Sequence, residues 1–136
     1  KGRGQYGRHW VSYKGNIFMT VYFNINKNMS IKYLSKKVYI TLKKSLEKFV
    51  SEKITIKLPN DLLIKGHKVC GILQETVFYK SKKFAVIGIG VNIKSSPMIN
   101  NYPTTYLNFF TDKNLSSFKI YNEIKMNFEN YLKLKT

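Results

Sequence analysis

The 136-residue sequence has few of the residues that cross-link a chain or carry it through a membrane. Its single cysteine, Cys70, excludes an internal disulfide and fits a reducing compartment such as the cytoplasm. We expect this thiol to be packed in the core. There is no run of about 18 apolar residues, so we expect no membrane-spanning helix. A hydrophobic content of 43% and an aromatic content of 15% instead predict one folded domain.

Acidic residues are also scarce, with 7 Asp+Glu against 24 Lys+Arg and a net charge of +17. Such a balance is typical of proteins that bind nucleic acid or another anionic partner. The lysines, however, occur throughout the chain rather than in one block, which favours solvated charged faces over a nucleic-acid interface. Some affinity for acidic partners should follow in either case.

Arginine is the scarcest cation, because Arg3 and Arg8 are the only two in the chain. Both lie in the opening segment KGRGQYGRHW, together with the only tryptophan, Trp10. Arginine presents a rigid planar fork that matches carboxylates and phosphates, and the three glycines of the segment let backbone approach a ligand closely. The segment therefore predicts a loop that binds an anion, with an aromatic plane beside it.

The same segment has the glycine spacing of a dinucleotide-binding fingerprint, Gly2-x-Gly4-x-x-Gly7. That fingerprint needs a strand before it, a helix after it and an acidic residue about 20 positions later. Here the following residues resemble a strand, and the first acidic residue is Glu47. We therefore reject a dinucleotide-binding fold, and we reject a Walker motif because no Gly-Lys-Ser/Thr follows.

The apolar pattern predicts an α+β fold, a mostly antiparallel mixed sheet flanked by helices. Ser30 is placed to cap a helix that ends near Val50, and Ser116 or Ser117 a second helix that ends near Leu134. The strands are predicted at residues 16–25, 54–58, 62–64, 69–79 and 84–93, the last of them buried and central. The apolar stripe of the first helix consists of Ile31, Leu34, Val38, Leu42, Leu46 and Phe49.

Polar residues follow the predicted strand at 54–58. Pro59, Asn60 and Asp61 are all turn-forming residues, so this segment can be an ordinary turn. The Asp61 carboxylate could instead hold Mg²⁺ beside phosphates, because Mg²⁺ takes one or two carboxylates together with phosphate oxygens. The local sequence leaves both interpretations open. His9 and His67 lack the spacing of metal ligands, and we expect neither to bind a metal.

Three glycines interrupt the two strands that a turn near residues 80–82 would pair, namely Gly71, Gly88 and Gly90. Glycine inside a strand often marks close approach of a ligand or of another backbone. Pairing of these strands could place the three glycines on one patch and leave a slot for a flat ligand. Lys68 precedes the first of these strands, where the local sequence also allows an ordinary surface lysine.

Three blocks in order carry a resemblance, namely KGRGQYGRHWVSYKGNIFMT, KLPNDLLIKGHKVCGILQE and IGIGVNI. Together they resemble the catalytic domain of biotin protein ligases, also called biotin–[acetyl-CoA-carboxylase] ligases. The family pattern is close to GRGR-x-GR-x-W, K-W-P-N-D-L, K-x-x-G-I-L-x-E and G-x-G-x-N. Its order and spacing match over about residues 1 to 93, and the later YPTTYL also resembles some members. The resemblance implies the fold of class II aminoacyl-tRNA synthetases.

The resemblance implies a biotin site. Arg3, Gly4 and Gln5 match the loop that closes over biotin and the acyl phosphate, and Lys68 matches the lysine near the biotin carboxylate and the α-phosphate. Arg3 and Lys68 would be the catalytic residues. The floor of the biotin slot would be formed by Gly71, Ile72, Gly88 and Gly90.

The resemblance also implies an ATP site. Arg8 matches a second arginine on the phosphate side, and Trp10 matches the aromatic residue that packs against adenine. Asn60 and Asp61 match the ATP and Mg²⁺ side, with Asp61 as the candidate metal ligand. Asn92 matches the nucleotide end of the slot.

The implied reaction uses ATP and Mg²⁺ to convert biotin to biotinyl-5′-AMP. The biotinyl group then passes to a lysine in the biotin carboxyl carrier domain of acetyl-CoA carboxylase. Two anions must come together, so the chemistry needs cations rather than a protein nucleophile, and no Ser–His–Asp or Cys–His arrangement is evident. Two alternatives are a lipoate or octanoate ligase or transferase of the same superfamily, and a basic nucleic-acid-binding module.

The chain departs from the family pattern in several places. Gln5 stands where many members carry a third arginine, and Leu58 replaces the usual tryptophan. The family's upstream Ser-Thr segment and a glutamine, both biotin contacts, do not occur before Lys1, and the C-terminal barrel does not follow Thr136. Residues 1–136 are therefore expected to be a partial catalytic domain that is not fully active by itself.

Overall fold

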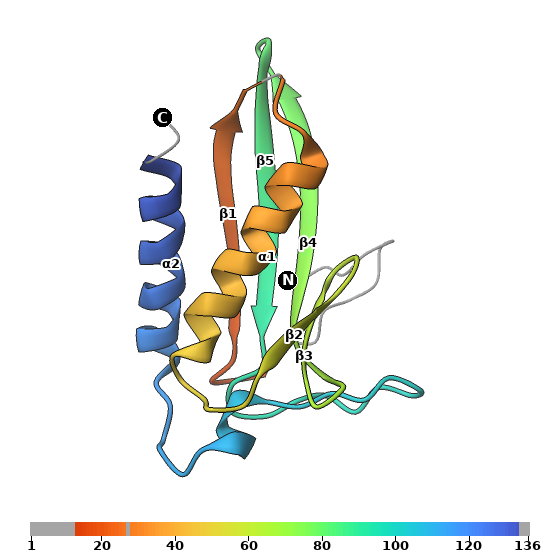
Figure 1. Cartoon of the computed structure of the whole chain (residues 1–136), viewed down its shortest axis with the longest axis vertical. Coiled ribbons are helices and arrows are strands. Elements are labelled where there is room, and N and C mark those ends of the chain that lie inside the picture. Colours follow the sequence, from red (N-terminus) through yellow and green to blue (C-terminus); the bar gives the residue numbers. More distant parts are fainter. Residues whose placement is uncertain (1–12, 27, 134–136) are drawn as a thin grey trace.

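The computed structural model describes residues 13–26 and 28–133. The described part contains a five-stranded sheet in the order β1-β5-β4-β3-β2, with every pair of neighbouring strands antiparallel (Figure 1). The α+β fold expected from the sequence is confirmed. In chain order the elements are β1 (Ile17–Ile25), α1 (Ile31–Glu47), β2 (Ile54–Lys57), β3 (Asp61–Ile64), β4 (His67–Tyr79), β5 (Lys82–Val91), the 3₁₀ helix η2 (Leu107–Phe110) and α2 (Ser117–Lys133).

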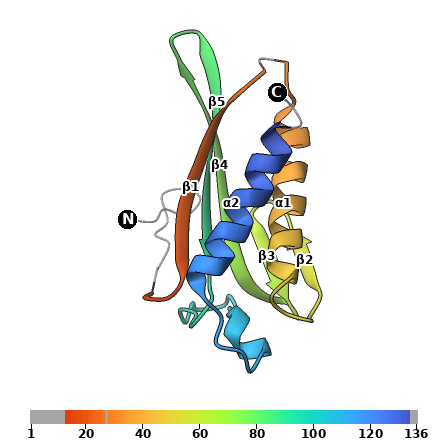
Figure 2. The ribbon, with the colours of Figure 1, turned by 90° about the vertical axis from the view of Figure 1, so that its left-hand side faces the viewer.

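Both helices cover the same face of the sheet (Figure 2). The α1 helix begins after Ser30, whose side chain accepts a hydrogen bond from the Tyr33 N–H and so caps the helix as predicted. Most of the predicted stripe of α1 is buried, but Ile31 is 42% exposed, which corrects the sequence prediction for that residue. Side chains on a helix lean toward its N-terminus, so a side chain at the first position extends past the helix end rather than over the sheet.

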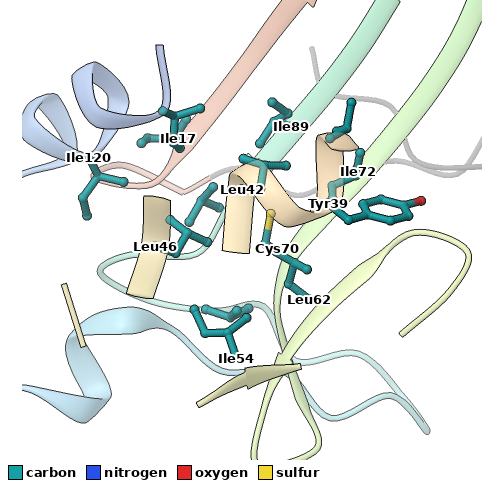
Figure 3. Close-up of a cluster of buried hydrophobic side chains, with 14 of the residues drawn as sticks. Ile17, Tyr39, Leu42, Leu46, Ile54, Leu62, Cys70, Ile72, Ile89 and Ile120 are labelled. Carbon is teal, nitrogen blue, oxygen red and sulfur yellow. The ribbon is translucent and has the colours of Figure 1, made fainter. Parts of the chain in front are cut away.

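The core lies between the helices and the sheet (Figure 3). Strand alternation directs every second residue of β5 toward the helices, and Ile87, Ile89 and Val91 are fully buried there. Cys70 is also fully buried, and this burial raises the pKa of its thiol to about 12. The prediction of a packed core thiol is confirmed.

Several predicted boundaries shift by one or two residues. The β2 strand ends at Lys57, and Leu58 is 71% exposed. The β5 strand ends at Val91 because the following backbone carbonyls, of Asn92 and Ile93, accept hydrogen bonds from the η2 segment instead of from a strand. No helix in the described part of the chain is long and apolar enough to cross a membrane.

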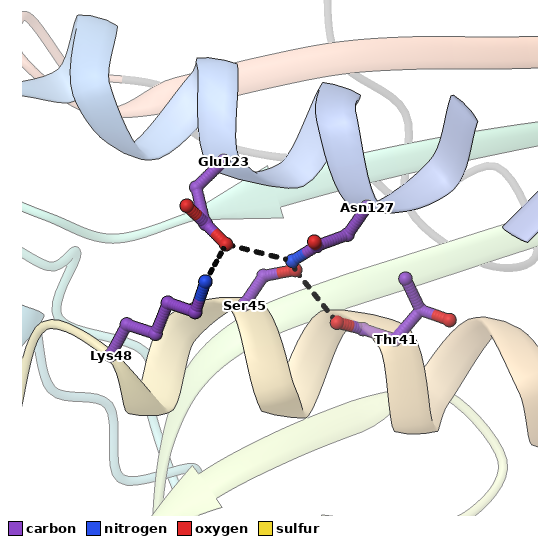
Figure 4. Close-up of polar contacts among 5 residues, drawn as sticks. All are labelled: Thr41, Ser45, Lys48, Glu123 and Asn127. Carbon is purple, nitrogen blue, oxygen red and sulfur yellow. Dashed lines mark hydrogen bonds and ion pairs between the residues drawn. The ribbon is translucent and has the colours of Figure 1, made fainter. Parts of the chain in front are cut away.

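Helices α1 and α2 are joined by polar contacts (Figure 4). The Asn127 amide donates to the Ser45 hydroxyl at 2.8 Å and to the Glu123 carboxylate at 3.0 Å. The Lys48 ammonium lies 2.6 Å from the same carboxylate. Hydrogen bonding to Lys48 is the main reason that the pKa of Glu123 lies below its ordinary value. These contacts hold the second helix beside the first, on the covered face of the sheet.

Candidate functional site

The three strand glycines lie on one patch, as predicted. Gly71 pairs with Gly90, and Leu73 pairs with Gly88. Directly paired residues of antiparallel strands project from the same face of a sheet. The residues that alternate with them, such as Ile89, are buried beneath the helices, so the glycines face the opposite side of the sheet. We call this patch, formed by Gly71, Gly88 and Gly90, the glycine face.

One row of paired residues crosses all five strands through the glycine face. From β1 to β2 this row consists of Phe18, Gly90, Gly71, Asp61 and Lys57. An aromatic ring therefore stands at one end, two glycines lie in the middle, and a carboxylate and an ammonium group stand at the other end. Along this row the surface is first apolar, then has no side chains at the glycines, and finally carries charged groups.

Lys68 reaches this face because of a β-bulge. Strict alternation along β4 would put Lys68 on the helix side with Cys70. Instead, Lys68 and Cys70 pair with consecutive residues of β3, and Val69 is an extra residue between them. Lys68 pairs with Leu63, which shares a face with Asp61. The bulge thereby turns the lysine side chain from the core side to the glycine face.

Lys68 and Asp61 form an ion pair, with 3.0 Å between Nζ and Oδ1. Both side chains are largely buried, with 19% and 12% of their surface exposed. Beneath them, on the helix side, burial raises the pKa of Tyr39 and of Cys70. The Asp61 charge raises the pKa of Tyr39 further, whereas the Lys68 charge lowers the pKa of Cys70 and the Asp61 charge raises it less strongly. Both groups stay neutral at ordinary pH, so the charged pair rests on an uncharged layer.

The two predicted asparagines lie beside the two members of this ion pair: Asn60 directly precedes Asp61, and the Asn92 N–H donates at 2.9 Å to the carbonyl of Val69, the residue after Lys68. The Asn60 carbonyl accepts the Ile72 N–H at 2.8 Å, which fixes the turn before Asp61 against β4. Asn92 is only 1% exposed, and its amide donates to the Thr105 carbonyl at 3.2 Å. The Asn92 Oδ1 has no hydrogen-bond partner among the described residues. A buried acceptor of this kind is costly unless a ligand or water supplies the donor.

The remaining predicted residues fall into two groups. The Ile72 side chain packs in the core beside Ile89 (Figure 3), so only its backbone borders the glycine face. The opening-segment predictions lie outside the described residues; they concern Arg3, Gly4, Gln5, Arg8 and Trp10. In residues 13–26 and 28–133 no group of three or more His, Cys, Asp or Glu is arranged to hold a metal.

Sequence reasoning missed three residues that the structure brings to this site. Phe18 stands directly beside Gly90 and is 39% exposed. Lys57 and Tyr102 lie close to Lys68. The signals were present, because Lys57 opens the KLPNDL block, Tyr102 opens YPTTYL, and Phe18 lies in the first block. None of these residue types is distinctive enough to stand out without the register of the sheet.

Sequence comparison defines the class of protein. Residues 1–92 match the Biotin/lipoate A/B protein ligase family, and the chain belongs to this family. The chain is 33% identical over 115 residues to biotin–protein ligase 1, chloroplastic, of Arabidopsis thaliana, which covers 79% of this chain and 30% of that protein. It is 35% identical over 100 residues to the biotin–[acetyl-CoA-carboxylase] ligase of Paracoccus denitrificans, covering 71% of this chain and 42% of the relative.

Comparison with solved structures agrees with the family found by sequence comparison. A biotin protein ligase from Aquifex aeolicus in complex with biotin and ATP superposes with a TM-score of 0.74 and 25% sequence identity. The match covers 96% of this chain and 57% of that structure. The chain thus spans less than half of these curated relatives and rather more than half of the solved structure.

Proposed function

We propose that this chain is the catalytic part of a biotin–protein ligase, which forms biotinyl-5′-AMP from biotin and ATP and transfers the biotinyl group to a protein lysine. The observation that carries the proposal is the row from Phe18 through Gly90 and Gly71 to Asp61, with Lys68 turned onto the same face. The names of the relatives and of the structural neighbour support biotin over lipoate or octanoate.

The row suits the shape of biotin. Biotin has a compact, mostly apolar double ring and an aliphatic tail that ends in a carboxylate. The glycines allow a ring to lie against backbone, and Phe18 supplies an apolar wall. The carboxylate would then point toward Lys68 and Asp61, where the ammonium group offsets its charge. A ligand with this division between an apolar ring and an anionic tail fits the order of residues along the row.

The residues of the charged end suit acyl-adenylate chemistry. A biotin carboxylate oxygen bonds to the α-phosphorus of ATP, and the bond from that phosphorus to the bridging oxygen breaks, so that pyrophosphate leaves with the electron pair. Lys68 lowers the repulsion between the two anions and stabilises the charge that develops on the phosphorus oxygens. In the second step an acceptor lysine amine attacks the acyl carbon, loses a proton and releases AMP.

The described residues fit Mg²⁺ as a companion of the nucleotide. Asp61 provides one carboxylate, and Mg²⁺ commonly binds one or two carboxylates together with substrate phosphates. Bound Mg²⁺ would neutralise phosphate charge. Lys68, which pairs with Asp61 here, would then be free to turn toward the reacting carboxylate and phosphate.

We infer that the acceptor is the biotin carboxyl carrier domain of acetyl-CoA carboxylase, as the name of the Paracoccus relative suggests. The net charge of +17 favours docking of an acidic protein surface. We place the reaction in the cytoplasm, because Cys70 is a buried free thiol and a reducing compartment suits it.

The test is direct detection of the acyl-adenylate. The chain, and a version with the family's Ser-Thr segment and glutamine joined before Lys1, are incubated with Mg²⁺, α-labelled ATP and either biotin, lipoate or octanoate. We expect biotinyl-AMP from the extended version, and Lys68→Met should remove most of it. Lys65→Met, at the exposed β3–β4 turn, is the matched control. An adenylate with lipoate but not biotin would establish the alternative, and no adenylate with any acid would refute the proposal.

A further inference from the structure

Tyr102 brings two lysines from different strands together at the charged end of the row. The Lys57 ammonium lies 5.2 Å from the centre of the Tyr102 ring, and the Lys68 ammonium lies 5.3 Å from the same centre. The face of an aromatic ring carries partial negative charge and attracts cations at this distance. Lys57 ends β2 and Lys68 is near the start of β4, whereas Tyr102 belongs to the loop after β5.

The backbone holds this loop at Lys68. The Lys68 N–H donates to the Pro103 carbonyl at 2.9 Å, and the Thr105 N–H donates to the Lys68 carbonyl at 2.8 Å. The Thr104 hydroxyl donates to the Pro97 carbonyl at 2.6 Å, which ties the two arms of the loop to each other. Tyr102 immediately precedes this anchored stretch, and its own N–H donates to the Ile99 carbonyl at 3.2 Å, so the backbone that carries its ring is held beside Lys68.

The side chains gathered here have the chemistry of a phosphate site. Lys57 stands opposite Asp61 in the register of β2 and β3, and Lys68 forms an ion pair with the Asp61 carboxylate. Two ammonium groups and one carboxylate leave a net positive charge. The Tyr102 hydroxyl is buried and has no hydrogen-bond partner among the described residues, so it could donate to an incoming oxygen. Cations beside a hydroxyl donor are suited to phosphate oxygens.

We propose that Lys57 binds the part of the nucleotide that leaves as pyrophosphate, and that Tyr102 positions the ammonium groups of Lys57 and Lys68. This inference rests on the proposed function and adds residues to its site. Along the row, Lys57 lies one strand beyond Asp61, on the side away from the glycines. A ligand that reaches past the reacting carboxylate therefore meets Lys57 next. Negative charge grows on pyrophosphate as its bond breaks, so a cation there favours the transition state.

The first test measures binding of inorganic pyrophosphate to the chain by calorimetry, with and without Mg²⁺. We expect Lys57→Met to weaken binding by about tenfold or more, and Lys57→Arg to restore it to within about threefold. Lys53→Met removes a nearby exposed lysine that has no place in the row and should change little. Equal affinities in Lys57→Met and Lys53→Met would overturn the assignment.

The second test separates the ring of Tyr102 from its hydroxyl. In adenylate formation by the extended version, Tyr102→Leu should lower kcat by about tenfold with little change in the KM for biotin. Tyr102→Phe keeps the ring and loses only the hydroxyl donor, so it should recover part of kcat. Melting temperatures show whether each variant is folded. If folded Tyr102→Leu and Tyr102→Phe both match the parent, the positioning role is wrong.

The two proposals fail separately. If pyrophosphate binding depends on Lys57 but no acid is adenylated, the biotin ligase function is wrong and the phosphate site stands. If biotinyl-AMP forms and Lys57→Met leaves both pyrophosphate binding and the KM for ATP unchanged, the phosphate site is wrong and the ligase function stands.

Discussion

Substitution of Gly88 by alanine adds one methyl group to the glycine face without disturbing the protein beneath it. A Cβ at this position would lie 3.8 Å from the nearest atoms, both of Leu73, which is ordinary contact distance. The folded state therefore has room for the methyl group, and loss of glycine's freedom in the unfolded chain should stabilise the protein by up to about 1 kcal/mol. The melting temperature should stay constant or rise slightly.

The same methyl group should obstruct a ligand. It would project about 1.5 Å from the backbone, where the proposal places a ring directly against the strand. Forcing an extra methyl group into a close-packed contact typically costs about 1 to 3 kcal/mol, which corresponds to roughly 5- to 150-fold weaker biotin binding. Stability and affinity should thus change in opposite directions.

Gly66→Ala is the matched control. Gly66 lies in the β3–β4 turn with a φ of 78°, and nothing lies within 4 Å of the Cβ it would gain. Alanine in this left-handed conformation should cost about 1 to 2 kcal/mol of stability and leave biotin affinity unchanged. Calorimetric titration with biotin and thermal unfolding of both variants complete the comparison. Undiminished biotin affinity in a folded Gly88→Ala protein would refute binding at the glycine face.

Four further predictions concern stability and reactivity. Both polar atoms of the Gln74 amide are buried without a hydrogen-bond partner in the described part of the chain. Gln74→Leu should therefore raise the free energy of unfolding by about 1 to 3 kcal/mol in urea titrations. A lower free energy of unfolding in the variant would show that the amide does have a partner. Asn127→Ala should lower the free energy of unfolding by about 1 to 2 kcal/mol, because the α1–α2 contacts through Ser45 are lost; an unchanged urea midpoint would contradict this. The pKa of Glu123 is lowered in the folded state, so its contribution to the free energy of unfolding is present at neutral pH and is lost as the pH falls below the ordinary carboxyl pKa of 4.5. Lys48→Met should therefore make the free energy of unfolding less sensitive to acid. An identical acid profile in the variant would exclude the Lys48–Glu123 pair as the cause. The Cys70 thiol, with its pKa raised to about 12, should not react with a thiol reagent at pH 8 until urea unfolds the chain, and rapid labelling of the folded protein would refute its burial.

The sequence predicted well those features that depend on local periodicity. The alternation of β5, the Ser30 cap and the turns at the ends of β4 set the elements, and pairing of the glycines follows from the short connection between β4 and β5. A tight hairpin fixes the register of its strands, which is why one patch of glycines could be expected from the sequence.

Features that depend on a break in periodicity or on a distant loop could not be predicted. Nothing in the residues around Val69 indicates a bulge, yet the bulge decides which face Lys68 occupies. Tyr102 reaches Lys68 only because the loop after β5 folds back and bonds to the β4 backbone. Ile31 fits the helical stripe in sequence and still lies beyond the part of the helix that covers the sheet.

The row across the sheet also sets the distance between the glycines and the charged groups. Neighbouring strands lie about 4.8 Å apart, and this spacing is set by backbone hydrogen bonds that side-chain substitutions barely change. The distance from Gly90 to Asp61 therefore consists of whole strand spacings, and the tail of a bound acid would have to span it for its carboxylate to meet Lys68, the ion-pair partner of Asp61. An acid with the same ring and a tail shortened by two methylene groups would bind by its ring yet leave the carboxylate short of Lys68. Selection by tail length would then reside in the backbone of the sheet, and selection by ring size in Phe18 and the glycines.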